Sequence, residues 1–568
     1  MVSTPALQRV AALEQRLGDP FDPDNPLGYG AVLDADEQGD TFKAGEDALT
    51  EFGMNAELVP RTWGGRFSRL DDLIAVGRVA SRRDPGLGAG YVTSSLLAGV
   101  CVWLAGNDDQ RRHIADTLLA GHRLACAYHE LDHGSDFAAV DFSARPAGDR
   151  LVLDGRKEVI ANVSRARALV LFAATGELRA GQTHSQLLLR HEDLIGERVT
   201  HLPRFGTVGL RGVHLGGISF DAAPVDAARV LGEPGRGAEN TMKAFQLTRI
   251  ALPAMMTPVL DTALRCTVRH LRGRTLYGGP AIEMPHLKSK LVDAFVALLA
   301  ADAFSTAAAR TLHVHPGEGP VQASAVKYLL PTLLVDAMNQ LATALGAHSY
   351  VAEGPTAVFP KLLRDIQAIS VVHISKAACR MTLLPQMPLL ARRFRRTAQP
   401  SHEALFALDA DLPPLDFARL RVTGDGQDHL FGGLRAGLAA LDEERGQEAE
   451  LIRPLADALA AEAQRLSDRC AHLPASELGS GASPSTARLV DRYVRLALAG
   501  ACLETWRHNR RSGTSWMPAW LVAALTRIAG CSAGRLPDQI ENRLFAELLA
   551  RCDGGRDLGW TAHPVFGT

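Results

Sequence analysis

The sequence lacks an excess of charge of either sign. Its 61 Lys and Arg side chains and 63 Asp and Glu side chains nearly cancel, which leaves a net charge of -2. Such a balance creates no broad electrostatic field that would attract nucleic acid or a membrane surface. We therefore expect no nucleic-acid partner and expect any ligand to be recognised by local groups.

Closely spaced cysteines and long apolar runs are also missing. The eight cysteines contain no CxxC pair, which is the spacing that builds zinc and redox sites, and scattered thiols are typical of a reducing compartment. No run of about 18 uninterrupted apolar residues is present, and residues 1–20 lack the apolar core of a secretory signal. These absences predict a cytoplasmic protein without membrane insertion.

Four regions of different texture follow one another along the 568 residues. Helical periodicity dominates the first and returns after a stretch of short β-type runs separated by Gly, Asp and Pro. We predict an α+β fold with two helical regions after the sheet. The predicted parts are an N-terminal helical domain (1–121), a middle β-barrel or sandwich domain (122–231), a four-helix-bundle domain (232–395) and an additional C-terminal helical domain (396–568).

Short glycine-rich and charged motifs occur in a fixed order between residues 64 and 365. They are Gly64-Gly65, Glu130 with Gly134-Ser135-Asp136, Lys157 with Asn162, Gly209-Leu210-Arg211-Gly212, Gly235 with Gly237, Arg249, Arg274 with Tyr277-Gly278, and Arg364-Asp365. In order and spacing this series resembles the acyl-CoA dehydrogenases. The additional C-terminal domain resembles the larger, acyl-CoA oxidase-like members, which append a second bundle.

The resemblance implies an acyl-CoA dehydrogenase fold and an enzyme that uses FAD to oxidise an acyl thioester. The thioester would be carried by CoA or by an acyl-carrier protein, and the enzyme would be a homodimer or larger homo-oligomer. No metal is implied. The implied cofactor-binding residues are Tyr128, His129, Ser135, Val159, Ile160, Ala161, Arg274, Tyr277, Gly346 and Ser375, and the implied substrate-binding residues are Ser135, Gln246, Arg249 and His373.

Two of these residues have a physical reason beside the resemblance. Arg274 suits the FAD diphosphate, because a guanidinium presents forked donors to phosphate oxygens; the competing interpretation is a surface arginine of a helix. Ser135 lies in a Gly-Ser-Asp turn, which exposes backbone N–H groups and a hydroxyl to a polar ligand. Ser135 and Arg249 are equally compatible with structural caps or ion pairs.

The carboxylate that acts as base in the resembled family is replaced. The family places a Glu, in a Glu-Gly-Thr triplet, eight residues after the Asp of an Arg-Asp pair; here that position is His373, followed by Ile374-Ser375. The other known place for the Glu is occupied by Thr248. An imidazole acts as a general base near neutral pH, so His373 is the candidate catalytic base. The competing interpretation is a hydrogen-bonded core histidine.

Several flavin contacts of the family are altered as well. Val159-Ile160-Ala161 replaces a Trp-Ile-Thr run, and His129 replaces a threonine. A lost side-chain donor costs about 1 kcal/mol when the group is buried. Three hypotheses therefore remain open: FAD-dependent dehydrogenation with His373 as base, a non-redox reaction of an acyl thioester such as proton transfer, elimination or cyclisation, and an inactive scaffold subunit of a hetero-oligomer.

Two further motifs have a simpler explanation. The segment His129-Glu130-Leu131-Asp132-His133 matches the HExxH pattern of zinc proteases, which requires a helix. A β-type run precedes the segment and Gly134-Ser135-Asp136 follows it, so we predict a turn. The glycine-rich run at residues 86–90 does not lie between a strand and a helix of a βαβ unit, and we predict a flexible turn there too.

Overall fold

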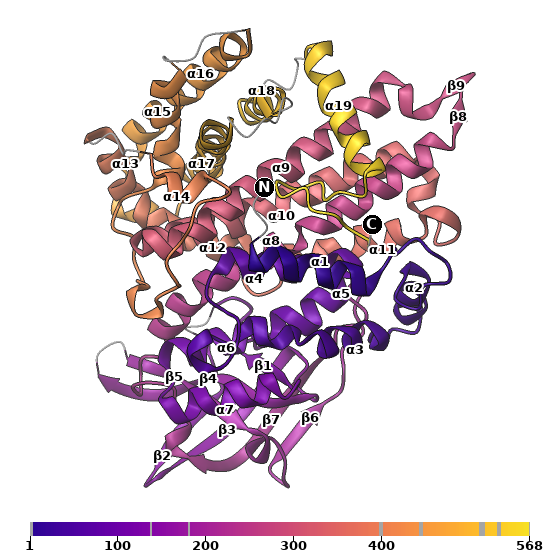
Figure 1. The fold of residues 1–568 in the computed structure, drawn as a ribbon. Helices are drawn as coiled ribbons and strands as arrows, with labels where there is room; N and C mark the ends of the chain where they lie inside the picture. The colour runs from indigo at the N-terminus through magenta and orange to yellow at the C-terminus, as the bar shows by residue number, and fades with distance from the viewer. Residues whose placement is uncertain are drawn as a thin grey trace. The chain divides into compact units, whose positions relative to one another are not determined.

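The computed structural model describes residues 4–136, 139–179, 182–396, 401–441, 447–510, 517–530 and 536–566. The chain forms two compact units. We call one the bundle unit, made of Met1–Gln15, Arg249–Pro414 and Thr423–Thr568. The other is the sheet unit, made of Arg16–Thr248 and Leu415–Val422. Figure 1 labels the helices and strands of both.

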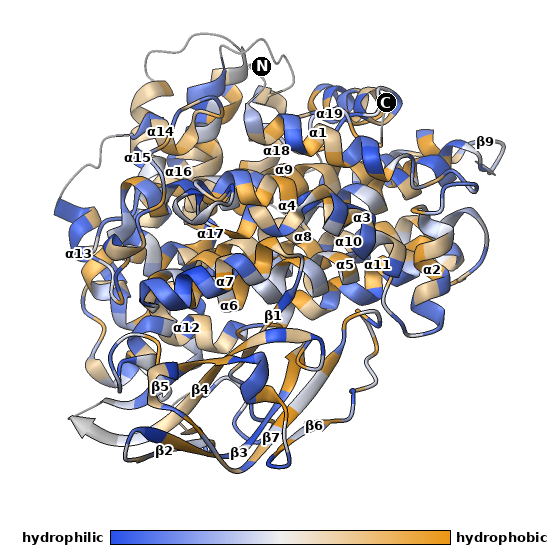
Figure 2. Ribbon diagram, turned by 60° about the horizontal axis from the view of Figure 1, so that its bottom comes forward, coloured by the Kyte–Doolittle hydropathy of each residue, from blue (hydrophilic) through white to orange (hydrophobic). Residues whose placement is uncertain are grey.

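Helices form the first part of the chain. They are α1 (Pro5–Leu17), α2 (Tyr29–Glu37), α3 (Lys43–Phe52), α4 (Leu70–Arg83), α5 (Pro85–Leu87), α6 (Ser94–Ala105) and α7 (Asp108–Leu119). Helix α6 is mainly hydrophobic and α7 mainly hydrophilic (Figure 2). This difference follows from burial, because α6 packs against the sheet and has no exposed residue, whereas several residues of α7 are exposed.

The glycine-rich run at residues 86–90 is helical, so the prediction of a flexible turn there is wrong. It spans α5 and the π-helical turn η3 (Gly88–Thr93). The carboxylate of Asp84 caps α5 by accepting the backbone N–H of Leu87 at 2.8 Å. A Cβ atom at Gly88 would lie 2.1 Å from the hydroxyl of Ser81. The glycine therefore allows close packing against α4 rather than flexibility.

The sheet occupies the middle of the sheet unit. Its strands are β1 (Arg123–Ala127), β2 (Ser143–Ala147), β3 (Arg150–Ala161), β4 (Ala166–Arg179), β5 (Gln182–Arg190), β6 (Val199–Leu202) and β7 (Leu215–Asp226). The strands pair in the order β1-β4-β2-β3-β7-β6, and β5 pairs with β4. Strands β3 and β7 are antiparallel, and the inward positions of the strands form one apolar core.

The bundle begins with three long helices, as the sequence predicts. These are α8 (Gly237–Arg272), α9 (Pro285–Val314) and α10 (Gly319–Leu345). A short hairpin of β8 (Thr275–Leu276) and β9 (Gly279–Pro280) lies between α8 and α9. The shorter α11 (Val358–Ile366), α12 (Lys376–Leu383) and α13 (Met387–Arg396) follow. Long helices of this kind carry an apolar face around most of their circumference, because neighbouring helices cover them.

A helical extension completes the described chain and confirms the predicted fold class. Its helices are α14 (Glu403–Phe406), α15 (His429–Leu441), α16 (Gln447–Cys470), α17 (Pro484–Asn509), α18 (Met517–Ile528) and α19 (Asp538–Asp553). Helices α15 and α17 approach closely at Gly500, where a Cβ atom would lie 2.0 Å from the carbonyl oxygen of Leu430. A side chain at that position would therefore separate the two helices.

Two helical stretches, Pro85–Ala105 and Pro285–Val314, are long and apolar enough to cross a membrane. In each of them 83% of the apolar window is buried inside the protein, so packing in a core accounts for their composition. The seven described cysteines are free, as predicted. Cys531 lies outside the described residues.

Candidate functional site

Two cations are buried side by side on α8 and α10 of the bundle unit. Arg249 is 6% exposed and Lys327 is 2% exposed. The guanidinium of Arg249 donates to the Ser324 hydroxyl at 3.3 Å, and its buried Nε has no hydrogen-bond partner among the described residues. No described carboxylate forms an ion pair with either cation. Because buried charges are normally paired, this arrangement is suited to a ligand that is negative or becomes negative.

Burial disfavours the charged form of both side chains. It lowers the pKa of Lys327 to about 8; the Cys379 thiol raises this pKa by a smaller amount, and the Arg249 guanidinium lowers it further. It also lowers the pKa of Arg249, which nevertheless stays protonated in proteins. The thiol of Cys379 has a raised pKa, again because of burial, and is neutral at pH 7. Positive charge therefore dominates this part of the bundle.

The loop that carries His373 is attached to Lys327. The ammonium group donates to the carbonyl oxygens of Ile369 at 2.6 Å and Val372 at 2.9 Å. His373 itself is 7% exposed and has a φ of 74°, a conformation that costs a residue other than glycine about 1–3 kcal/mol. Such strain is found where surrounding structure holds a residue for a task. The structure thus brings two predicted substrate residues, Arg249 and His373, around one lysine.

Lys327 predicts a pH effect on stability. Its folded pKa of about 8 lies below the ordinary value of 10.5, so between these values the unfolded chain binds a proton that the folded chain does not. The free energy of unfolding should therefore rise with pH across this window, by about 3 kcal/mol for this group. Urea denaturation from about pH 7.5 to about pH 10.5 should show a smaller rise in Lys327→Met. Lys43→Met, an exposed control, should keep the full rise, and parallel curves for all three proteins would contradict the assignment.

Ser375 lies two residues beyond His373 and caps a helix. Its hydroxyl accepts the backbone N–H of Ala378 at 3.3 Å at the start of α12. The same turn contains a bond from the N–H of Ile374 to the carbonyl of Val372 at 3.0 Å. This cap fixes where α12 begins, so it also fixes the position of the residues just before it.

A second group of nitrogen-rich side chains lies near the ends of α8 and α10. The rings of His270 and His348 are 4.4 Å apart. Burial lowers the pKa of His270, and the nearby His348 and Arg274 lower it further. Arg274 has no acidic partner among the described residues, and Gly346, which ends α10 with a φ of 61°, is two residues before His348. Three donors without a carboxylate suit a phosphate-bearing ligand.

Tyr277 is placed on the hairpin that follows Arg274. It occupies the turn between β8 and β9 with a φ of 50°, and it is 96% exposed. A large aromatic side chain that is this exposed makes no use of its apolar surface within the described chain.

In the sheet unit, the predicted flavin residues of β3 surround a bulge. The register of β3 against β7 shifts between Lys157 and Ile160, and Val159 has a φ of 56° and is 36% exposed. This φ is a genuine outlier for a β-branched residue. Ile160 is buried and Ala161 is half-buried. The bulge therefore offers an apolar side chain and backbone groups to a ligand, but no side-chain donor.

The predicted residues at the end of β1 are placed in two different environments. Tyr128 is buried, and its hydroxyl bonds with Thr241 at 3.1 Å and accepts the amide of Gln186. Its polar end is therefore used inside the core. His129 is half-buried and its Nδ1 is 3.2 Å from the carbonyl oxygen of Gly134, and burial lowers its pKa. Ser135 is half-buried in the turn that follows.

The HExxH-like segment forms the predicted turn and is held by a buried ion pair. Glu130 accepts Lys157 Nζ at 2.7 Å and the backbone N–H groups of Asp141 at 2.9 Å and Phe142 at 3.1 Å. Lys157 is fully buried and Glu130 is 8% exposed. Residues 131–135 are a turn, so the prediction of a turn is confirmed. The carboxylate of Glu130 serves to fasten this turn to β3.

Gln246 has a structural role within the sheet unit. It is 1% exposed, and its amide donates to the carbonyl oxygens of Met242 at 3.2 Å and Arg421 at 2.5 Å. It therefore fastens the segment 415–422 to α8. Its Oε1 is buried without a hydrogen-bond partner among the described residues, which leaves one acceptor for a ligand.

Three residues that matter at these sites were not predicted as functional. Lys327, His270 and His348 stand in helical or turn segments with no local motif around them. Their importance comes from neighbours far away in the chain, such as the Val372 carbonyl for Lys327. Because these neighbours are distant in the sequence, no local pattern could have indicated the three residues.

Part of the chain is similar to a known protein family. A family model described as acyl-CoA dehydrogenase, C-terminal domain, matches residues 235–373. The human mitochondrial short-chain specific acyl-CoA dehydrogenase is 27% identical over 267 residues, which are 46% of this chain and 63% of that enzyme. The match thus spans less than two-thirds of that relative.

Solved structures share the fold over the first two-thirds of the chain. Butyryl-CoA dehydrogenase from Megasphaera elsdenii has a TM-score of 0.60 at 19% identity and covers 67% of this chain and 97% of its own. PigA with FAD and proline has a TM-score of 0.61 at 16% identity and covers 68% of this chain and 98% of its own. The helical extension lies beyond this shared part. Residues 235–373 therefore match the C-terminal domain model of the acyl-CoA dehydrogenases, and the chain shares the fold of these enzymes with a C-terminal helical extension after the shared part.

Proposed function

We propose that the protein is a cytoplasmic FAD-dependent enzyme that removes hydrogen from the α and β carbons of an acyl thioester carried by CoA or a carrier protein. The main support is the pair of buried cations, Arg249 and Lys327, beside the loop of His373. Removing an α proton moves negative charge onto the thioester oxygen. Fixed positive groups in a site that excludes water stabilise that charge strongly, and here no described carboxylate neutralises them.

In this proposal His373 is the base. A neutral imidazole accepts the α proton and becomes positive while the thioester becomes negative, so the two charges attract each other. The backbone N–H of residue 373 donates to the thioester carbonyl, a function that does not depend on the side chain. The Lys327 contacts hold the loop in place despite the strained backbone of residue 373. FAD, when bound, would supply the oxidant for the β carbon.

Each unit has groups that suit one part of FAD. In the sheet unit, the bulge at Val159 offers an apolar side chain and backbone groups to a flat ring system. In the bundle unit, Arg274 and His270 lack acidic partners among the described residues and suit the diphosphate. The exposed hairpin at Tyr277 is suited to contact a second subunit, so we propose a homodimer or larger homo-oligomer.

Absorption spectroscopy tests the cofactor. After incubation with FAD and gel filtration, the protein should retain the flavin absorption bands. Arg274→Ala should bind FAD at least about tenfold more weakly, because it loses a charge-assisted hydrogen bond worth about 1.5–3 kcal/mol. Arg198→Ala, which removes an arginine of the sheet edge, is the control and should retain FAD. Absence of flavin from the reconstituted wild-type protein would overturn the redox function.

A second function is favoured by one observation, the loss of side-chain donors at residues 159–161. A protein with the same cation pair and His373 but without FAD would transfer a proton within an acyl thioester instead of oxidising it. Turnover of a thioester without flavin, lost in His373→Ala, would establish this function in place of the first.

A further inference from the structure

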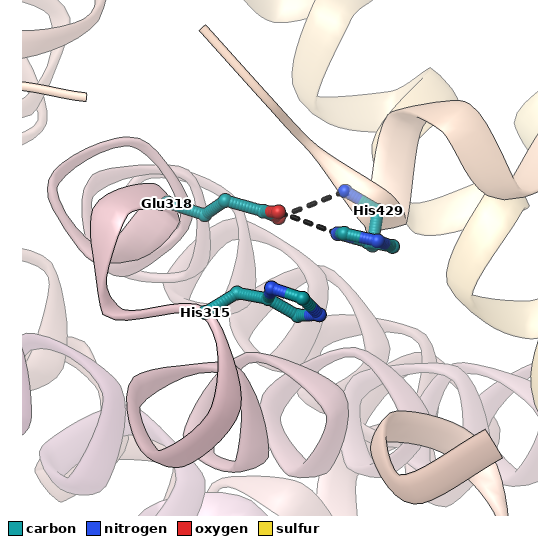
Figure 3. A group of neighbouring side chains, drawn as sticks. All are labelled: His315, Glu318 and His429. Atoms are coloured by element: carbon teal, nitrogen blue, oxygen red, sulfur yellow. Dashed lines mark hydrogen bonds and ion pairs between the residues drawn. The ribbon is translucent and has the colours of Figure 1, made fainter. Parts of the chain in front are cut away.

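Three potential metal ligands meet where the helical extension joins the bundle unit. His315 ends α9, Glu318 precedes α10 in the turn Pro316–Glu318, and His429 is the first residue of α15. Figure 3 shows the carboxylate of Glu318 directed at His429, with the ring of His315 beside both. The ring centroids of His315 and His429 are 4.2 Å apart and the planes differ by 18°. Three segments thus deliver ligand-type side chains to one point.

The distances within the group suit an ion after small side-chain rotations. One ligand atom from each of the three residues lies within 4.8 Å of the other two. In a tetrahedral zinc site with bonds of about 2.0–2.1 Å, ligand atoms stand roughly 3.3 Å apart. Glu318 Oε1 and His429 Nδ1 are 2.5 Å apart, so they would separate slightly and His315 would move inward.

The surroundings of Glu318 are built to orient it. Its other carboxylate oxygen accepts Gln322 Nε2 at 2.7 Å and the backbone N–H of His429 at 2.8 Å. These bonds leave Oε1 directed at the imidazole. Metal-binding carboxylates are typically held by such outer contacts.

Burial adds a reason for a cation at this point. Glu318 is fully buried, and the carboxylate of Asp428, which is 5% exposed, contacts the same Gln322 amide at 3.3 Å. The His429 imidazole forms an ion pair with Glu318 when it is protonated. A divalent ion in place of that proton would supply more positive charge to the two carboxylates, which are costly to bury in a dry region. A fourth side chain, His402, has its ring 4.8 Å from that of His315 and a buried Nδ1 without a hydrogen-bond partner among the described residues.

We propose that His315, Glu318 and His429 bind one divalent transition-metal ion, best matched by zinc, with His402 next to the remaining coordination position. Two imidazoles and a carboxylate are a common zinc ligand set. The ion would link the extension, through His429, to the turn between α9 and α10. The site has a structural role, separate from the proposed oxidation of a thioester, so its failure would leave that proposal unaffected.

Metal analysis of the purified full chain tests the site. After removal of metal with a chelator and titration with zinc or cobalt, the wild-type protein should bind one ion per chain and should melt at a higher temperature with the ion than without it. Bound Co²⁺ should give the visible absorption of a tetrahedral site with nitrogen ligands. Failure of the wild-type protein to bind zinc or cobalt would overturn the proposal.

Variants separate this site from adventitious binding. Glu318→Gln keeps the size of the side chain, and both it and His429→Ala should weaken metal binding at least about tenfold and abolish the metal-dependent rise in melting temperature. His472→Ala, which removes an exposed histidine of the extension, should behave like the wild type. Unchanged metal affinity in a folded Glu318→Gln protein would show that the ion is held elsewhere and would also overturn the proposal.

Discussion

Replacing His373 with alanine should lower the turnover of an acyl thioester by about 10²–10⁴-fold, the usual contribution of a general base. The fold should be retained, because the loop is held by the bonds from Lys327 to the carbonyls of Ile369 and Val372 and not by the imidazole alone. FAD content and melting temperature should therefore stay close to the wild-type values. Steady-state kinetics of the flavin-loaded protein measures the effect.

A carboxylate at the same position provides an informative comparison. In His373→Glu the new side chain would lie near the two buried cations, Arg249 and Lys327, and would restore the type of base that the resembled family uses. Turnover should exceed that of His373→Ala. Turnover of His373→Ala within twofold of the wild type would remove His373 from the mechanism.

The second large effect concerns stability. Lys157→Met should lower the free energy of unfolding by about 3–5 kcal/mol, because it leaves the buried carboxylate of Glu130 without its cation. Replacing both residues with methionine should cost less than the single change, since no buried charge then remains. Urea denaturation followed by circular dichroism gives these values.

An exposed ion pair serves as the control for that experiment. Lys43 and Asp47 form a pair one helical turn apart on α3, with side chains 71% and 53% exposed. Lys43→Met should change the free energy of unfolding by about 0.5 kcal/mol or less. Equal losses in Lys157→Met and Lys43→Met would show that burial of the Glu130–Lys157 pair has no energetic weight.

Much of the fold could be predicted because the deciding signals are local. The 3.6-residue period of apolar positions predicts long helices at residues 240–271, 286–312 and 323–345, and the observed α8, α9 and α10 start and end within a few residues of these segments. Short β-type runs between Gly, Asp and Pro indicated the sheet. Local signals failed at residues 86–90, where glycines serve close helix packing against Ser81. The presence of a glycine does not reveal whether it gives the backbone freedom to turn or allows close packing of two helices.

The candidate site could be predicted only in part. The resemblance indicated Arg249 and His373, whose positions are fixed by motif spacing. It gave no indication that Lys327 lies near both, because that contact joins a helix to a loop more than 40 positions later. That no carboxylate among the described residues pairs with the two cations is also a property of the folded chain. The cluster of His315, Glu318 and His429 joins residues of the bundle to a residue of the extension. No local sequence pattern relates these two parts of the chain.

Hydrogen exchange at the α carbon directly tests whether His373 is the catalytic base. A saturated acyl-CoA incubated with the flavin-loaded protein in D₂O, without an electron acceptor, should gain deuterium at its α carbon as detected by mass spectrometry, because His373 removes and returns that proton reversibly. Uptake should be rapid with the wild-type protein and at least about 100-fold slower with His373→Ala. Equal uptake by the two proteins, or no uptake across a series of acyl chain lengths on CoA and on carrier protein, would contradict it.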